Sequence, residues 1–167
     1  PHMIEKAIKP RQDWLPISKL VVVENSTNRG GGNYYTLDEQ IKIHNTCRLN
    51  NLKLHLDGAR LFNVLVETGD NPAVIGPLYD TISICLSKGL GAPAGSVLLA
   101  SKEDIQNARR IRKVMGGGMR QIGILASAGL YALENNIDRL KDDNERARKI
   151  GDVLASLNYI DYVHPVK

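Results

Sequence analysis

Residues 81–95 read TISICLSKGLGAPAG, and this stretch determines how the rest of the chain is interpreted. Its first part, Thr81–Leu86, is apolar or β-branched, which predicts a buried strand. Lys88 follows and enters a turn rich in glycine and proline. Burial of a lysine at the end of such a strand would favour the neutral amine that reacts with carbonyl groups. Taken alone, the pattern indicates a lysine whose head group reaches solvent more often than a catalytic one.

Strands and helices are expected to alternate on both sides of this stretch. Other apolar runs predict strands over residues 20–23, 53–56 and 96–100. The residues Thr36-Leu37-Asp38-Glu39 form a capping box and open a helix that ends near Asn50. Further helices are predicted over 60–67, 102–115, 122–134 and 137–157, with a short helix before residue 17 and a loop over 68–80. This order predicts an α/β fold with a mainly parallel sheet flanked by helices.

The apolar patterns also predict which surfaces are buried. The continuous apolar run Leu20–Val23 is expected to be covered on both faces. The helix over 122–134 is apolar nearly all round and is expected to be buried on several sides. The predicted helices over 102–115 and 137–157 are amphipathic, and their apolar residues are expected to face inward. In the first helix these are Ile105, Ala108, Ile111 and Met115. In the second they are Ile137, Leu140, Ala147, Ile150, Leu154 and Leu157.

The composition is that of an ordinary soluble globular protein. The chain has 167 residues, of which 43% are hydrophobic and 24% charged, with a net charge of +4. Cys47 and Cys85 lack CxxC spacing and are expected to be buried free thiols in a reducing cytoplasm. The longest apolar run, 122–133, is shorter than the roughly 20 residues of a membrane span, and no secretory signal peptide is visible. These features predict a cytoplasmic protein without a membrane partner.

Three other kinds of site are excluded by spacing. The segment GLGAPA at 89–94 fits a dinucleotide fingerprint, but it leads into a strand rather than a helix. The basic run at 108–113 lacks interleaved aromatic residues and suits the solvated face of a helix, so no nucleic-acid partner is expected. The four histidines show no metal-ligand spacing.

Asp57 and Lys88 end two consecutive predicted strands that are separated by a helix. In a right-handed parallel unit, both strand ends lie at the edge of the sheet where ligands bind. An aspartate and a lysine at such an edge can hold pyridoxal phosphate, the lysine through a Schiff base and the aspartate at the pyridine nitrogen. The sequence therefore predicts pyridoxal 5'-phosphate as the cofactor and Lys88 as the catalytic residue.

Three further residues are candidate cofactor contacts. Arg60 follows Asp57 closely and could contact the cofactor or a substrate carboxylate, although a surface pair with Asp57 is the alternative. His55 shares a strand face with Asp57 and is expected either to support it or to bond to the backbone in the core. Arg120 follows three glycines at the start of a helix and could contact phosphate.

Three motifs in order carry a family resemblance: HLDGAR at 55–60, SKGLGAP at 87–93 and GGGMRQ at 116–121. Together they closely resemble the low-specificity L-threonine aldolases, which are pyridoxal-phosphate enzymes of the β-eliminating lyase group with the aspartate-aminotransferase type of fold. The resemblance implies cleavage of L-threonine or L-allo-threonine to glycine and an aldehyde. It implies Lys88 as the lysine that carries the cofactor, Asp57 as the pyridinium partner, and Arg60 and Arg120 as cofactor or substrate contacts. It also implies a homo-oligomer, a dimer or a tetramer.

The chain departs from the family pattern in two respects. In Glu24-Asn-Ser-Thr-Asn-Arg29, Thr27 stands where the family commonly has a histidine that positions the substrate hydroxyl. The 167 residues also resemble only the central part of the large domain, without the N-terminal segment and the C-terminal small domain, and residues 1–3 are set aside as a cloning remnant. The alternatives are another pyridoxal-phosphate lyase on the same scaffold, or a non-catalytic fragment that only folds or associates.

Overall fold

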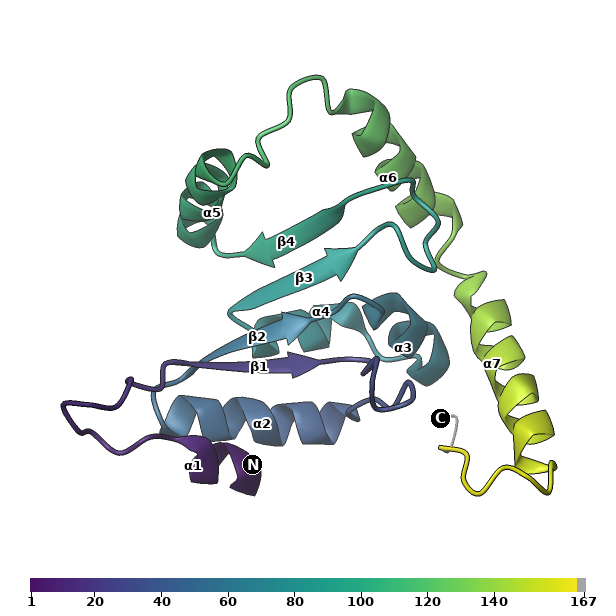
Figure 1. Ribbon diagram of the computed structural model, residues 1–167. Coiled ribbons are helices and arrows are strands. Elements are labelled where there is room, and N and C mark those ends of the chain that lie inside the picture. The colour runs from purple at the N-terminus through teal and green to yellow at the C-terminus, as the bar shows by residue number, and fades with distance from the viewer. Residues whose placement is uncertain (165–167) are drawn as a thin grey trace.

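A four-stranded sheet forms the centre of the computed structural model, which describes residues 1–164. The strands are β1 (Leu20–Glu24), β2 (Lys53–Asp57), β3 (Thr81–Cys85) and β4 (Ser96–Ala100), and they lie side by side in this order. β1, β2 and β3 are parallel, and β4 is antiparallel to β3 (Figure 1). The predicted α/β fold with a mainly parallel sheet is confirmed.

The helices follow the predicted order with small shifts at their ends. They are α1 (His2–Ala7), α2 (Leu37–Leu49), α3 (Leu61–Thr68), α4 (Pro72–Ile75), α5 (Lys102–Val114), α6 (Gly123–Asn135) and α7 (Leu140–Ala155). The predicted loop over 68–80 contains α4 and a 3₁₀ turn, η1 (Gly76–Leu78). This short helix forms because Asn71 Oδ1 accepts a hydrogen bond from Ala73 N and Pro72 stands at the first helical position. None of the helices in residues 1–164 combines the length and apolar character that crossing a membrane requires.

The capping box of α2 forms as the sequence predicts. Thr36 Oγ1 accepts a hydrogen bond from Glu39 N at 3.3 Å, and Glu39 Oε2 accepts one from Thr36 N at 2.8 Å. Two backbone donors that the first turn of a helix cannot satisfy are therefore paired. This fixes the start of the helix that covers β2.

The larger core cluster joins the sheet to α2 and the helices after β2. Leu54 and Leu56 of β2 are completely buried, together with Cys47 of α2. Removing an apolar side chain of this size from water contributes about 1.5–3 kcal/mol. A second cluster, made of Leu86, Leu90, Ala92, Ala132 and Leu140, packs the turn after β3 against α6 and α7.

A buried hydrogen-bond chain crosses the larger core. Tyr79 Oη donates to Gln40 Oε1 at 2.9 Å, and Gln40 Nε2 donates to Tyr35 O at 3.0 Å. Gln40 has no exposed surface, so both ends of its amide need these partners. Burial raises the pKa of the Tyr79 hydroxyl, which therefore stays protonated and keeps donating.

The expected burial of β1 on both faces is wrong. Leu20 is 55% exposed and Val22 is 57% exposed, whereas Val23 on the opposite face is buried. β1 is an edge strand, and within the described chain only one of its faces meets core side chains. A continuous apolar run therefore marks a strand here but does not guarantee two covered faces.

The helices after β4 are also less buried than their patterns predict. In α6 only Gly129 and Ala132 are buried, and Ile124 is 85% exposed, so its expected burial on several sides is wrong. α5 has no buried residue, and both Ile111 and Met115 are exposed instead of facing inward. These two helices lie beyond β4, where no other layer of residues 1–164 packs against their outer sides (Figure 1).

α7 packs on α3 through few apolar and several polar contacts. Leu140 faces inward as predicted, but Ala147, Ile150 and Leu154 are exposed. Asn144 Nδ2 donates to the Asn63 carbonyl oxygen at 3.0 Å and, also at 3.0 Å, to Glu67 Oε2. Arg148 Nη1 pairs with Glu67 Oε1 at 2.7 Å and, as the main cause, lowers the pKa of that carboxyl. Polar complementarity thus sets the register of α7 on α3.

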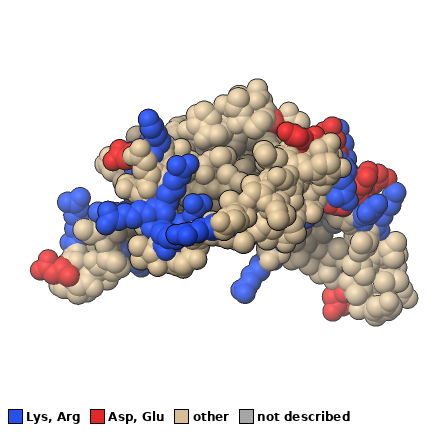
Figure 2. All heavy atoms as spheres, turned by 90° about the horizontal axis from the view of Figure 1, so that it is seen from above, with Lys and Arg blue, Asp and Glu red and all other residues tan. Residues whose placement is uncertain are grey.

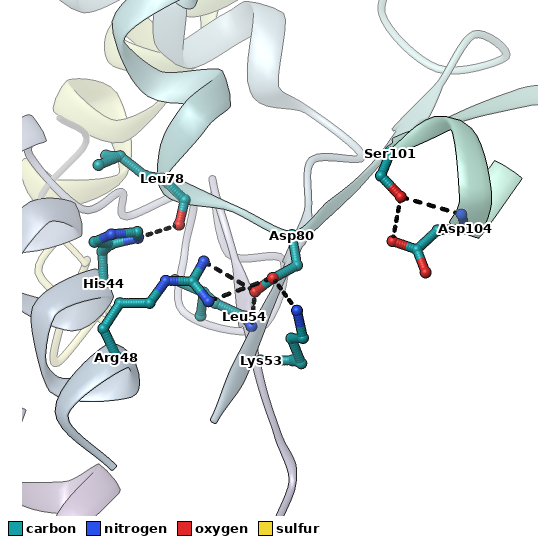
Figure 3. A network of polar contacts seen from close by, with 8 residues as sticks. All are labelled: His44, Arg48, Lys53, Leu54, Leu78, Asp80, Ser101 and Asp104. Atoms are coloured by element: carbon teal, nitrogen blue, oxygen red, sulfur yellow. Dashed lines mark hydrogen bonds and ion pairs between the residues drawn. The ribbon is translucent and has the colours of Figure 1, made fainter. Parts of the chain in front are cut away.

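Asp80 connects α2, β2 and the start of β3 (Figure 3). Its carboxylate accepts hydrogen bonds from Lys53 Nζ at 2.9 Å, from Leu54 N at 2.8 Å and from Arg48 Nη2 at 3.1 Å. Burial alone would raise the pKa of Asp80, but these three donors outweigh burial and hold the pKa at about 2. The ionised carboxylate therefore stabilises the folded chain.

Replacing Asp80 with asparagine should lower the free energy of unfolding at pH 7 by about 2 kcal/mol. The reason is that a carboxyl group whose pKa is lower in the folded than in the unfolded chain stabilises the fold when it is ionised. The folded pKa is about 2 and the ordinary value is 3.8. The ionised Asp80 carboxylate therefore contributes fully to stability at any pH above its ordinary pKa. This contribution is lost as the pH falls through the folded pKa. Urea unfolding of both proteins at pH 7 and near pH 2 measures this difference, and an equal gap at both pH values would contradict it.

Candidate active site

Three parallel strands end at one edge of the sheet and bring polar residues together. Glu24 is the last residue of β1 and pairs in register with Asp57, the last residue of β2. Asp57 in turn pairs with Ser83 of β3. In Figure 1 this carboxyl edge lies on the right, where β1, β2 and β3 all point. The turn that carries Lys88 leaves β3 at the same edge, as the sequence predicts.

Asp57 is half-buried and keeps acceptor capacity for a ligand. Its Oδ1 accepts a hydrogen bond from Ala59 N at 3.1 Å. Within residues 1–164 its side chain has no ion-pair partner, so the alternative of an Asp57–Arg60 surface pair is not observed. A carboxylate with a free oxygen at a strand end can accept a hydrogen bond from the protonated ring nitrogen of a bound heterocycle.

The turn after Asp57 is held close to β3. Gly58 N donates to Ser83 O at 2.8 Å, and Asn25 N donates to Asp57 O at 3.0 Å. A Cβ at Gly58 would lie 2.9 Å from that Ser83 oxygen, which is closer than side chains tolerate. Glycine is therefore required at this position for β2 and β3 to meet at the site.

Lys88 is exposed, which matches the alternative of a lysine whose head group reaches solvent. The chain leaves β3 before this residue and turns sharply, with Gly91 at φ +77° and a hydrogen bond from Gly91 N to Lys88 O of 2.8 Å. Ala92 N also donates to Leu86 O at 3.0 Å, which closes the turn. Lys88 thus stands on an anchored turn with its amine open to a ligand.

α6 and α7 support this turn from behind. Asn136 Nδ2 donates to Leu90 O at 2.7 Å. A Cβ at Gly89 would lie 2.8 Å from Leu140 Cδ2, so α7 packs directly on the residue after Lys88. The position of Lys88 therefore depends on helices that begin more than 30 residues later in the chain.

Arg60 is oriented by a residue that sequence reasoning missed. Its Nη2 donates to Asn28 Oδ1 at 3.5 Å, and the Asn28 backbone N–H donates to Glu24 Oε1 at 3.0 Å. Asn28 thus links the end of β1 to the arginine that follows Asp57. The only signal in the sequence was its place in the Glu24–Arg29 stretch, which carried no contact information.

His55 takes neither of the two expected partners. Its Nδ1 lies 2.6 Å from Thr81 Oγ1, across the β2–β3 register, so the ring contacts a side chain rather than the backbone or Asp57. His55 and Asp57 still lie on the same face of β2 and are both half-buried. The contact holds the ring in the sheet beside the site.

Arg120 lies away from these residues in the described chain. It is exposed, in the segment that joins α5 to α6, and this segment lies beyond β4 in Figure 1. No hydrogen bond or ion pair within residues 1–164 connects it to Asp57, Arg60 or Lys88. Its assignment as a cofactor or substrate contact stays a prediction.

Thr27 is engaged within its own turn. Its Oγ1 donates to Asn33 O at 3.1 Å, and its backbone N–H donates to the same oxygen at 2.8 Å. The hydroxyl at this position therefore stabilises the loop after β1 and is not directed to a ligand.

The donor set fits pyridoxal phosphate better than a metal ion. No group of three or more histidine, cysteine or acidic side chains suited to a metal occurs among the described residues. An open lysine amine and a carboxylate with a free oxygen stand at one sheet edge, with Arg60 close to the carboxylate in sequence. These are the groups that bind an aldehyde cofactor with a basic ring nitrogen.

Comparison with known proteins identifies the chain's relatives. Residues 1–166 match the family model of the beta-eliminating lyases. A low specificity L-threonine aldolase of Escherichia coli is 43% identical over 147 residues, which are 88% of this chain and 43% of that protein. Low-specificity L-threonine aldolase 1 of Arabidopsis thaliana is 37% identical over 159 residues, which are 94% of this chain and 44% of that protein.

The solved threonine aldolase of Leishmania major has the same fold. It superposes with a TM-score of 0.78 at 28% identity, over 91% of this chain and 46% of that one. The fold and the edge site thus define an α/β protein built like the known threonine aldolases. The chain belongs to the beta-eliminating lyase family and spans less than half the length of these relatives.

Proposed function

We propose that the protein is a pyridoxal-phosphate-dependent lyase that cleaves L-threonine, L-allo-threonine and related β-hydroxy-amino acids to glycine and an aldehyde. The observation that carries this proposal is the placement of Asp57 and Lys88 at the carboxyl ends of adjacent parallel strands, with Asp57 unpaired and the Lys88 amine open. Relatives at 37–43% identity that are named as low-specificity threonine aldolases support the choice of substrate.

The residues of this chain have distinct tasks in that reaction. Pyridoxal phosphate, when bound, supplies an electron sink for the pair released from the broken Cα–Cβ bond. Lys88 would hold the cofactor through its amine, and the Asp57 carboxylate would keep the pyridine nitrogen protonated. Arg60, oriented by Asn28, is the cation available near Asp57 for an anionic oxygen of cofactor or substrate. We assign Arg120 to a phosphate or carboxylate contact that the described chain alone does not make.

A second candidate is another pyridoxal-phosphate-dependent amino-acid lyase on the same scaffold. The observation that favours it is Thr27, whose hydroxyl is bonded to Asn33 O at the position where the resembled family commonly has a histidine. A threonine hydroxyl is a weak base, so handling of the substrate hydroxyl would differ from that of the family. Turnover of threonine compared with a panel of amino acids that lack the β-hydroxyl separates the two candidates.

We also propose that these residues are the central part of the large cofactor-binding domain. The three motifs that carry the resemblance support this, and the match to 43–46% of the length of the relatives compared above agrees with a part of a longer protein. The exposed apolar side chains on β4 and α6 support a homo-oligomer, and they include Val97, Leu98, Leu99, Ile122, Ile124, Leu130 and Tyr131. Seen from above, the middle of the molecule is a broad area free of charged side chains (Figure 2). An uncovered area of this kind is typical of an interface.

A reducing compartment, the cytoplasm, is the proposed location. Cys47 is buried and Cys85 half-buried, and both are free thiols. Burial raises the pKa of the Cys47 thiol, which keeps it protonated and unreactive. Both features suit a protein that forms no disulfides.

Borohydride reduction of the protein with bound pyridoxal phosphate should leave a stable adduct on Lys88, because the turn that carries this lysine leaves β3 at the sheet edge where Asp57 lies. Peptide mass spectrometry locates the adduct, and Lys88→Ala should lose both the adduct and the visible absorbance of the cofactor. Lys141→Ala, which changes an exposed lysine of α7, serves as the matched control. An adduct on another lysine in protein that binds cofactor would contradict the assignment.

Asp57→Asn should weaken cofactor binding and slow turnover by more than about tenfold, since a hydrogen bond to a charged group contributes about 1.5–3 kcal/mol. The amide keeps the shape of the side chain but cannot hold the ring nitrogen protonated. Cofactor titration by absorbance and threonine cleavage measured through the released aldehyde check the two effects. Asp13→Asn, at an exposed aspartate in the segment that precedes β1, should leave both unchanged. Normal kinetics in Asp57→Asn would assign the electron-sink role elsewhere.

Ile124→Glu should shift the protein toward smaller species in sedimentation velocity, because a charge in the centre of an apolar interface must lose its water on association. Ile124 is 85% exposed, so the change should not disturb the folded chain itself. Leu49→Glu is the matched control, since that leucine is 84% exposed and belongs to α2, which lies by β1 at the opposite end of the strand order from α6 (Figure 1). A monomeric parent protein, or equal effects of both variants, would count against the α6 interface.

A further inference from the structure

A second site candidate lies at the amino edge of the sheet, opposite Lys88. A cavity of about 490 Å³ opens where β1 and β2 begin, between the segment that precedes β1 and the turn that joins α2 to β2. In Figure 1 these segments meet on the left, whereas the strands that lead to Asp57 and Lys88 end on the right. An occupant of this cavity would therefore not contact the groups that hold the cofactor.

Hydrogen bonds between backbone and neighbouring groups fix the walls of the cavity. Lys9 N donates to Ser18 Oγ at 3.0 Å, which ties the two ends of the segment before β1 to each other. Lys53 N donates to Lys19 O at 2.8 Å, which ties that segment to β2. Backbone groups, and not only side chains, therefore hold the walls of the cavity in place at this sheet edge.

The charged lining of the cavity is entirely basic. Four cations line it, Lys9, Arg11, Lys19 and Lys53, and no aspartate or glutamate does. Lys53 is neutralised by Asp80 at 2.9 Å. The side chains of the other three form no ion pair within residues 1–164.

The nearby helix end does not cancel this charge. The last turn of α2 points its carbonyl groups toward Asn50 and Asn51, and a helix C-terminus carries about half a negative charge. Most of these carbonyls are already used, since Asn50 N, Asn51 N and Leu52 N donate to Thr46, Arg48 and Cys47 oxygens. Three cations without an ion-pair partner outweigh the half negative charge of the helix end, so the cavity is strongly positive.

We propose that this cavity binds a small organic anion that carries two or more phosphate or carboxylate groups. Three cations without partners are a match for several negative charges, and Ser18 and Asn51 add polar groups to the lining. Apolar atoms of Ile8, Ile17 and Leu52 complete the wall and suit the carbon frame of such a ligand. The volume lies in the range of small-molecule sites. Binding here is independent of the cofactor site.

The test is isothermal titration of the purified protein with pyrophosphate and, separately, with citrate, at an ionic strength held constant with sodium chloride. We expect saturable binding of one anion per chain by at least one of the two probes, weakened as salt increases. The tighter probe tells whether phosphate or carboxylate is preferred. Lys19→Gln and Arg11→Gln should each weaken binding by about tenfold, since each removes a charge-assisted contact.

Two control variants test whether anion binding is specific to this cavity. Arg146→Gln removes the same charge from an exposed position on α7, far along the chain from the cavity, and should leave the affinity unchanged. Lys88→Ala should also bind the probes normally, which separates this site from the proposed cofactor site. Absence of saturable binding, an equal loss in Arg146→Gln, or binding of a nucleic-acid oligomer in place of both small probes would overturn the proposal.

Discussion

Parallel pairing of β2 with β3 sets Asp57 opposite Ser83 and sends the chain from β3 into the Lys88 turn at the same sheet edge. Gly58 permits this pairing because its N–H reaches Ser83 O in a space that a side chain would fill. At the other end of the two strands, Asp80 gathers donors from α2 and β2 and fixes the start of β3. The register of these two strands therefore determines whether the lysine and the aspartate can share a ligand.

The two edges of the sheet carry different chemistry for a topological reason. Parallel strands place all their carboxyl ends together and all their amino ends together, so loops of like kind gather at each edge. At the carboxyl edge the loops bring an unpaired carboxylate, Asp57, and an open amine, Lys88. At the amino edge they bring Lys9, Arg11 and Lys19 around a cavity. The two sites that we propose on this sheet therefore share no residues.

The uncovered surfaces have a common physical cause. β1 exposes Leu20 and Val22, and α6 exposes Ile124, because an apolar face is buried only when another layer packs on it. Within the described residues the cover reaches β2 and β3 but not the outer sides of β1, α5 and α6. Apolar surface left in this way favours association. The polar docking of α7 on α3 through Glu67 and Arg148 leaves the other side of α7 open as well, since Ile150 is exposed.

The sequence by itself determined the order of strands and helices, the capping box at Thr36, and the pair Asp57 and Lys88, because periodicity, capping and strand ends are local properties. Three motifs also identified the family, which the comparison confirms. Only the tertiary structure decided that Lys88 is exposed, that His55 bonds to Thr81 and that Asn28 orients Arg60. It also decided which apolar faces stay open and where the basic cavity forms. Each of these depends on contacts between distant segments, which the pattern of neighbouring residues does not encode.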